Sequence, residues 1–412
     1  MKIILYEHNS IKNLYPITLT RPGFDIFCAG TNLYHIITKQ LKPDSIDYKI
    51  RDYLYKTTKA KYQPNKKPDN KIIFLDSGLI PDFKSAQNLS AIIKKNKNII
   101  FKNKNQITGA YLDLEKIAIT YSKIQSLKHN QVIDFIKKLK LKTLEINWPC
   151  YNYLHEPISY NQKLLTSNLE FIKLEFKQLK PKVFIGKNVD INNQVVFNTD
   201  NGPIIINNDT KIKPFCYLQG PIYIGKNCLV HEFTSIKNNC SIGNVCRAGG
   251  EISNSIMSDY SNKQHYGFLG HSFIGSWANL AAGTTNSNLK NTYSYVKMNS
   301  VNSGEQFLGC IVGDNSKTAI NTPIYTGKII GVYSYIFSPV IENIPSFTSY
   351  IKNIKNSIEF KLETAIRIQK TPMKRRGVTQ TKADQELLKH VFKLTENERN
   401  QLNIKPGKIK LT

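Results

Sequence analysis

The sequence predicts a parallel β-helix joined to an α/β domain, and three patterns in the 412-residue chain support this fold class. Aliphatic residues recur every six positions through the middle of the chain. Small residues recur at the same interval, four positions after the aliphatic ones. Short apolar runs separated by polar segments occupy the N-terminal part. A period of six fits neither a helix, at about 3.6, nor an ordinary strand, at about 2, and hexapeptide repeats are typical of a β-helix.

The hexapeptide series is strictest in the middle of the chain. Its aliphatic members are Ile212, Leu218, Ile224, Val230, Ile236 and Ile242, and its second members are Cys216, Ile222, Cys228, Thr234, Cys240 and Cys246. We expect each repeat to form one short strand and one corner, with three repeats to a triangular coil. Because one coil cannot bury its own core, the coils must stack. The period loosens over residues 253–298, where we expect loops that build a functional site.

The N-terminal part, over residues 1–160, predicts a mixed α/β domain. Its apolar runs Lys2–Tyr6, Lys71–Leu75 and Asn98–Phe101 have the length and composition of buried strands. The spacing of strands and polar segments therefore indicates a sheet covered by helices.

We expect three further parts, a linking helix, a coil domain and a helical C-terminal extension, over residues 161–181, 182–345 and 346–412. Apolar residues over Leu164–Leu179 have a helical pattern, which predicts the linking helix. In the extension, Pro372 and the basic run Lys374–Arg376 separate two helical patterns. This run could contact phosphate, but we expect it to form a solvated linker.

Charge and composition limit the function. The net charge is +27, with 57 Lys+Arg against 30 Asp+Glu, but only seven of the cations are Arg. Because Arg is the residue best suited to bidentate phosphate contacts, we expect no nucleic-acid partner and attribute the Lys excess to genome composition. No apolar run approaches the roughly 20 residues that span a bilayer, and the start lacks a signal peptide. We therefore expect a cytoplasmic protein without membrane contact.

The seven cysteines do not form a metal-binding pattern. Cys216, Cys228, Cys240 and Cys246 are separated by multiples of six, which places them at one repeating inward position. Close Cys-x-x-Cys pairs are absent from the sequence. We therefore expect core residues, no disulfide framework and no metal.

The loosened stretch carries the motifs that point to chemistry. Glu251 precedes His265 by 14 positions, and the longest motif strings are Ser261–Ser272, Ala282–Asn291 and Gly313–Thr322. These motifs resemble those of bifunctional UDP-N-acetylglucosamine pyrophosphorylase/glucosamine-1-phosphate N-acetyltransferases, above all a divergent bacterial branch of that family. The resemblance covers most of the chain and implies that the β-helix is left-handed.

The resemblance implies N-acetylation of an amino-sugar 1-phosphate by acetyl-CoA. A free imidazole titrates near pH 6.5 and can accept a proton from an amine, which is the role implied for His265. Glu251 would orient this ring, and the backbone N–H of Ala282 would stabilise the developing oxyanion. Asn279 would contact the sugar, and Asn288 would lie where substrate and coenzyme meet.

Two departures from the family pattern concern the substrate phosphate. Phe268 replaces an aromatic hydroxyl, and Ser253 replaces a lysine that would contact the phosphate. The candidate replacements are Lys237, Arg247, Lys263, Lys290 and Lys297. For acetyl-CoA, the resemblance implicates Ala282, Gly283 and Lys290.

The N-terminal domain resembles sugar-nucleotide pyrophosphorylases more weakly. Leu14–Pro22 is similar to the end of their glycine-rich phosphate loop, but the glycines themselves are absent. Lys12 or Arg21 would contact the nucleotide, with UTP and Mg²⁺ as ligands. A working domain and a degenerate domain both remain open.

Three functions are therefore compared. The first is the acetyltransferase, with or without coupled nucleotidyl transfer. The second is a sugar-1-phosphate nucleotidyltransferase alone. The third is a non-catalytic β-helix scaffold that binds polyanions. By analogy with related β-helix acyltransferases, we expect a homotrimer.

Overall fold

The computed structural model describes residues 1–65, 67–95 and 97–407, and the chain divides into two compact units. The first unit consists of Met1–Ile26 and Thr31–Asn152, and the second consists of Phe27–Gly30 and Tyr153–Thr412. None of the helices within the described residues is long and apolar enough to cross a membrane.

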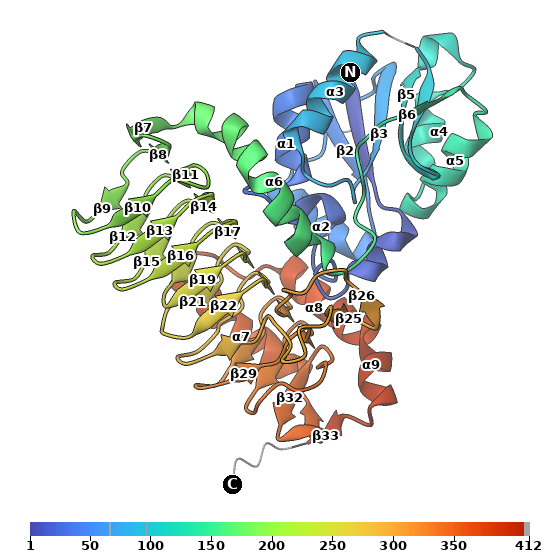
Figure 1. The fold of residues 1–412 in the computed structure, drawn as a ribbon. Coiled ribbons are helices and arrows are strands. Elements are labelled where there is room, and N and C mark those ends of the chain that lie inside the picture. The colour runs from blue at the N-terminus through green and yellow to red at the C-terminus, as the bar shows by residue number, and fades with distance from the viewer. Residues whose placement is uncertain (66, 96, 408–412) are drawn as a thin grey trace. The chain divides into compact units, whose positions relative to one another are not determined.

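The first unit is built on a six-stranded mixed sheet with the strand order β2-β1-β3-β5-β4-β6 (Figure 1). Its strands are β1 (Lys2–Tyr6), β2 (Ser45–Lys49), β3 (Lys71–Asp76), β4 (Ile99–Asn103), β5 (Gln106–Asp113) and β6 (Thr143–Glu145). β1 pairs in parallel with β2 and β3, whereas β5 runs antiparallel to β3 and β4. The three strands predicted from apolar runs are confirmed, because such runs suit strands buried on both faces.

Helices surround this sheet. They are α1 (Leu33–Leu41), α2 (Tyr55–Lys61), α3 (Phe83–Ile93), α4 (Tyr121–Ser126) and α5 (Val132–Lys138), with short 3₁₀ helices η1 (Asn9–Leu14), η2 (Gly23–Asp25), η3 (Asp52–Leu54), η4 (Leu114–Lys116) and η5 (His129–Gln131). Phe135 and Ile136 of α5 pack with Phe74 of β3 in one apolar cluster. The α/β prediction for this part is therefore confirmed.

The second unit is a parallel β-helix, as the hexapeptide period predicts. Ile206, Ile224 and Ile242 are strand partners in neighbouring coils and lie 18 positions apart, so three hexapeptides complete one coil. The parallel pairing confirms the predicted stacking.

Three coil sheets run along the stack (Figure 1). One contains β10 (Val196–Asn198), β13 (Tyr217–Gln219), β16 (Ser235–Lys237), β19 (Glu251–Ser253) and β22 (Phe268–Gly270). Another contains β9 (Asp190–Ile191), β12 (Lys211–Ile212), β15 (Leu229–Val230), β18 (Arg247–Ala248) and β21 (Asn262–Lys263). The third contains β7 (Lys177–Lys180), β8 (Val183–Ile185), β11 (Ile204–Ile206), β14 (Ile222–Ile224), β17 (Cys240–Ile242), β20 (Ile256–Met257), β23 (Phe273–Ile274), β27 (Ile311–Val312) and β30 (Ile329–Ile330).

Further sheets complete the unit. They are the pair β24 (Thr285–Asn286) and β29 (Pro323–Ile324), the pair β25 (Lys297–Met298) and β26 (Val301–Asn302), and the sheet of β28 (Lys317–Thr318), β31 (Tyr335–Ile336), β32 (Thr348–Ile351), β33 (Asn353–Glu359) and β34 (Lys405–Pro406).

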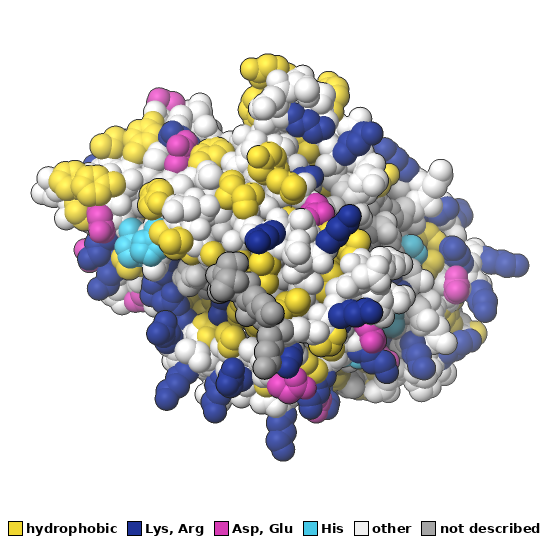
Figure 2. Space-filling model, turned by 90° about the horizontal axis from the view of Figure 1, so that it is seen from below, with side chains coloured by type: hydrophobic (Ala, Val, Ile, Leu, Met, Phe, Trp, Pro, Cys, Tyr) yellow, Lys and Arg dark blue, Asp and Glu magenta, His cyan; other side chains and the backbone are white. Residues whose placement is uncertain are grey.

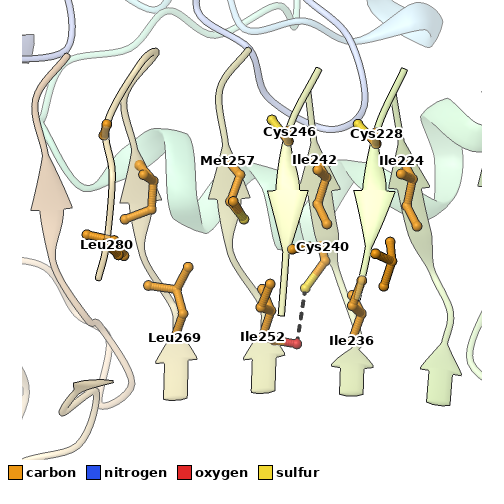
Figure 3. Close-up of a cluster of buried hydrophobic side chains, with 14 of the residues drawn as sticks. Ile224, Cys228, Ile236, Cys240, Ile242, Cys246, Ile252, Met257, Leu269 and Leu280 are labelled. Atoms are coloured by element: carbon orange, nitrogen blue, oxygen red, sulfur yellow. Dashed lines mark hydrogen bonds between the residues drawn. The ribbon is translucent and has the colours of Figure 1, made fainter. Parts of the chain in front are cut away.

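The coil interior holds the repeating side chains. Figure 3 shows Ile224, Ile242 and Met257 in a row along the stack, with Cys240 near the carbonyl oxygen of Ile252. The Cys240 sulfur lies 3.6 Å from that oxygen. All seven cysteines are free and buried, and the four of the hexapeptide series lie in the coil core as predicted.

The coils become irregular where the period loosens. Ile242 pairs with Met257, 15 positions on, and Ile274 pairs with Val312, 38 positions on. The chain between Ile274 and Val312 therefore includes a long excursion from the stack, which the loosened period predicts.

The helices of the second unit differ from the predicted ones. They are α6 (Glu156–Ile172), η6 (Lys173–Glu175), α7 (Leu362–Arg375), α8 (Lys382–Leu394) and α9 (Glu396–Gln401). The linking helix begins earlier than predicted because Pro157 occupies its first turn, where proline is favoured. It ends earlier because Lys177–Lys180 pairs with β8 as a strand.

The C-terminal extension begins with strands β32 and β33 before it becomes helical, which corrects the prediction for residues 346–361. Its last residues, 408–412, lie outside the described part. Pro372 lies inside α7 and does not end it, because Ala365, Gln369 and Met373 bury one face of this helix. The basic run Lys374–Arg376 therefore closes a packed helix and is no extended linker.

Candidate functional site

His265 lies on the corner between β21 and β22, where its side chain is exposed. The only side-chain partner found for it within the described residues is the amide nitrogen of Gln264, 3.1 Å from Nε2. The ring is therefore accessible to a ligand, as a general base must be.

Lys263 holds this corner from inside. Its side chain is only 1% exposed, and its ammonium donates hydrogen bonds to the carbonyl oxygens of Gly249, at 3.1 Å, and His265, at 2.6 Å. Burial lowers the pKa of Lys263 to about 8. The structure therefore does not support the predicted contact of Lys263 with substrate, because the amine is enclosed and already bonded to the backbone of Gly249 and His265.

Glu251 and Lys237 form an ion pair across β19 and β16, with 3.0 Å between Oε1 and Nζ. Both side chains are partly exposed. In the described structure, the Glu251 carboxylate, which was predicted to orient His265, pairs with Lys237, and His265 pairs with Gln264. The catalytic role of Glu251 remains a prediction, and Lys237 already has an acidic partner.

The turn of Ala282, Gly283 and Thr284 lies against the corner that carries His265. The N–H of Gly283 donates to the carbonyl oxygen of Tyr266 at 3.1 Å, so this N–H is already used. The carbonyl oxygen of Ala282 accepts a hydrogen bond from the N–H of Asn321. Within the described chain the N–H of Ala282 donates to no acceptor, which leaves it available for an oxyanion.

The coil faces on both sides of this corner carry pockets. The first, which we name the α7 pocket, has a volume of about 770 Å³. It is lined by Tyr260, Asn262, Gln264, Trp277, Asn279, Lys317, Ile368, Thr371, Pro372, Arg375 and Arg376. Asn279 and Gln264 connect this pocket to the predicted site.

The second, the β24 pocket, has a volume of about 720 Å³. It is lined by Thr285, Asn286, Ser287, Leu289, Lys290, Asn291, Thr292, Pro323, Ile324, Tyr325, Thr326, Lys328 and Ile341. Lys290 lines this pocket, and its ammonium donates to the carbonyl oxygen of Tyr295 at 2.9 Å; its coenzyme contact remains a prediction. Asn286 of β24 accepts a hydrogen bond from the N–H of Gly270, which stacks this strand on β22.

Two further predicted residues have protein partners. The Asn288 amide nitrogen lies 2.8 Å from Nδ1 of His271, whose ring stacks on Phe307. Burial lowers the pKa of His271 to about 4, so this ring stays neutral near pH 7. Arg247 donates to the carbonyl oxygens of Asn227 and Cys246, both at 3.2 Å.

The α7 pocket is electropositive. Burial, followed by the charge of Arg375, lowers the pKa of Lys317. Burial, followed by the charge of Arg247, lowers the pKa of Arg376. Sequence reasoning missed Lys317 as a site residue and assigned Arg375 and Arg376 to a solvated linker. The first lies in the Gly313–Thr322 string and the others in the basic run, but their meeting depends on how α7 packs.

In the N-terminal unit, Glu7 is buried at the end of β1 and bonded to Arg51, with 2.9 Å between Oε1 and Nη2. The same carboxylate accepts the N–H of Gly23. The ion pair between Glu7 and Arg51 therefore lies where a glycine-rich loop would leave room for phosphate.

The predicted nucleotide contacts lie in different environments. Lys12 is exposed on η1, where its contact remains a prediction. Arg21 is buried, and its charge acts on Asp25. Burial alone would raise the pKa of Asp25, but the charges of Lys61 and Arg21 lower it. The described residues contain no group of three His, Cys, Asp or Glu side chains that could hold a metal.

Residues 3–177 match the family described as sugar nucleotidyl transferase. A bifunctional sugar-1-phosphate nucleotidylyltransferase/acetyltransferase from Sulfurisphaera tokodaii is 32% identical over 152 residues, covering 34% of this chain and 37% of the relative. A bifunctional protein GlmU from Nostoc sp. is 27% identical over 177 residues, covering 42% of this chain and 32% of the relative. The solved structure of an Arabidopsis UDP-N-acetylglucosamine acyltransferase covers 57% of this chain and 83% of that chain, at 14% identity and a TM-score of 0.26.

These matches confirm the resemblance inferred from the motifs: parts of the chain are similar to sugar nucleotidyl transferases and to bifunctional nucleotidyltransferase/acetyltransferases. The matched parts cover about a third of the length of these curated relatives, 37% and 32%. The likeness to the solved structure, at its TM-score of 0.26, adds nothing to the fold seen directly in the strand pairing.

Proposed function

We propose that this protein transfers an acetyl group from acetyl-CoA to the amine of an amino-sugar 1-phosphate. The observation that carries the proposal is the corner between two pockets: it presents an exposed imidazole, that of His265, beside a turn whose Ala282 N–H is unused. The relationship to bifunctional nucleotidyltransferase/acetyltransferases supports the same reaction class.

Each group has a defined part in this proposal. His265 removes a proton from the sugar amine so that its lone pair can attack the thioester carbonyl. The N–H of Ala282 stabilises the oxyanion that forms on that carbonyl, and collapse of this intermediate expels the CoA thiolate. Asn279 and Asn288 contact the sugar, and Glu251 stabilises the imidazolium. Lys290, which lines the β24 pocket, contacts acetyl-CoA.

The test is release of CoA from acetyl-CoA and glucosamine 1-phosphate. His265→Ala should lower the rate about 10²–10⁴-fold, which is the usual contribution of a general base. His390→Ala removes an exposed histidine of α8 and is the matched control. Turnover of the His265 variant at the wild-type rate would contradict the assignment.

We further propose nucleotidyl transfer by the first unit, because residues 3–177 match the sugar nucleotidyl transferase family. Mg²⁺ is usually bound by one or two carboxylates together with substrate phosphates. Asp76 at the end of β3 fits this pattern, since its Oδ1 accepts the N–H of Gly78 and its Oδ2 is buried without a partner. Burial and the nearby charge of Glu7 raise the pKa of Asp76 to about 7.

Pyrophosphate release from UTP and a sugar 1-phosphate tests this second activity. The wild type should release it in a Mg²⁺-dependent manner and Asp76→Asn should not. Asp52→Asn, on η3, is a control that keeps the same change of charge. No release from the wild type would indicate a degenerate domain, with the acetyltransferase proposal unaffected.

We also propose a cytoplasmic homotrimer. The exposed rings of Phe215 and Phe233 stack with 5.1 Å between their centroids on the outside of neighbouring coils, and such apolar surface favours self-association. Free, buried cysteines agree with a reducing compartment. Light scattering of the wild type and Phe233→Asp would test the trimer: a monomeric wild type would contradict it.

A further inference from the structure

Three cations line the α7 pocket. Lys317 comes from coil strand β28, and Arg375 and Arg376 come from the end of α7. Arg376 is anchored, because its Nη2 donates to Oδ1 of Asn262 at 2.9 Å. Lys317 lies over the neutral ring of Tyr335, 5.3 Å from the centroid.

These charges are not neutralised by the protein. No acidic side chain lines the pocket, and none of the ion pairs within the described residues involves Lys317, Arg375 or Arg376. Elsewhere on the molecule Lys and Arg side chains are spread over the surface, as Figure 2 shows for one face. Lys317 and Arg376 are partly buried and Arg375 is exposed. Like charges that line one pocket repel one another unless an anion joins them, so their convergence calls for a ligand.

We propose that Lys317, Arg375 and Arg376 bind the phosphate of a phosphorylated ligand in the α7 pocket. Guanidinium groups suit phosphate because their planar N–H donors match its oxygen atoms in pairs. The proposal rests on the proposed function for its choice of ligands: the phosphate belongs either to the amino-sugar 1-phosphate or to acetyl-CoA.

The rest of the pocket suits a small organic molecule. Its volume of about 770 Å³ is in the usual range for such ligands. Tyr260 and Trp277 stack with 4.1 Å between centroids and present a flat apolar surface. Asn262, Gln264 and Asn279 supply amide groups that hydrogen-bond to hydroxyls. Since Gln264 precedes His265, a ligand held here by its phosphate would lie beside the proposed base.

The test measures binding by titration calorimetry of the full chain. The variants are Arg375→Gln with Arg376→Gln, and Lys317→Gln. The control is Arg367→Ala, which removes an exposed arginine of α7 outside the pocket. The probes are glucosamine 1-phosphate against glucosamine, and acetyl-CoA against pantetheine. If the double variant does not fold, Arg375→Gln alone is used in its place, because Arg375 is exposed.

We expect the double variant to bind one phosphorylated probe at least about 10-fold more weakly, because charge-assisted hydrogen bonds are lost. The unphosphorylated probes should be unaffected. Loss for glucosamine 1-phosphate alone identifies the sugar phosphate, and loss for acetyl-CoA alone identifies the coenzyme phosphates. Unchanged binding of both phosphorylated probes would overturn the site. His265→Ala separates the two proposals, since it should remove turnover and leave phosphate binding intact.

Discussion

Lys263 provides a direct test of how the coil supports the candidate site. Its ammonium is enclosed by the coil and bonded to two carbonyl oxygens, those of Gly249 and His265. Burial lowers its pKa from 10.5 to about 8. Replacement by methionine keeps an unbranched side chain of similar length but removes the titrating group.

The sign of the effect follows from proton binding. Between about pH 8 and pH 10.5 the unfolded chain keeps Lys263 protonated, whereas the folded chain has lost the proton. The unfolded state therefore binds more protons in this range, and the free energy of unfolding contributed by Lys263 rises with pH. A pKa difference of this size corresponds to about 3 kcal/mol once titration is complete. Below pH 8 both states are protonated and the contribution is constant.

The assay compares thermal unfolding of the wild type and Lys263→Met by circular dichroism from pH 7 to pH 10.5. The stability of the wild type relative to the variant should rise by about 3 kcal/mol, or roughly 6–12 °C in Tm for a unit of this size. Taking the difference at each pH cancels the titration of tyrosines and cysteines common to both proteins. Lys226→Met removes an exposed coil lysine and is the control. A difference that stays flat over this range would refute a buried amine.

Four further outcomes are expected. Ile242→Ala should lower the free energy of unfolding by about 2–5 kcal/mol in denaturant titrations, because Ile242 fills the coil interior; a loss below 1 kcal/mol would speak against that packing. Gly225→Ala should lower the Tm, since its Cβ would lie 2.6 Å from the carbonyl carbon of Gly243 in the next coil, and an unchanged Tm would mean that the coils separate easily. Glu7→Gln should lower the free energy of unfolding of the first unit by about 3–5 kcal/mol, because it leaves Arg51 buried without its ion-pair partner. Urea unfolding followed by tryptophan fluorescence measures this loss, and an unchanged midpoint would show that the ion pair contributes less. Thiol titration at pH 8 should label no cysteine rapidly in the folded protein and all seven after denaturation, because the thiols are buried and burial raises the pKa of Cys240 to about 12; rapid native labelling would contradict the packed coil.

The coil fold could be predicted in detail because its information is local and repeated. The position of a residue within its hexapeptide predicts whether its side chain faces inward. The register between Ile224 and Ile242 follows from counting 18 positions. The strand Lys2–Tyr6 was predictable for a similar reason, since a short run that is apolar throughout suits a strand buried on both faces.

The ends of helices and strands depended on tertiary contacts that compete with the local pattern, and the sequence pattern did not reveal these contacts. The residues at 177–180 continue an apolar pattern that fits a helix, yet they form a strand because the first coil offers β8 as a pairing edge. Similarly, Pro372 remains within α7 because tertiary packing of Ala365 and Met373 stabilises that helix.

For the candidate site, the sequence by itself determined which residues cluster along the chain, including the corner of His265 and the turn of Ala282. It did not determine which side chains face a ligand: Lys263 points into the coil, and Lys237 is paired with Glu251. Only the tertiary structure decided that Arg376 meets Asn262 across 114 positions and that Lys317 joins them in one pocket. The physical reason is that a repeat specifies contacts between successive coils, whereas the docking of a distant helix depends on the shape and charge of surfaces that exist only after the coils have stacked.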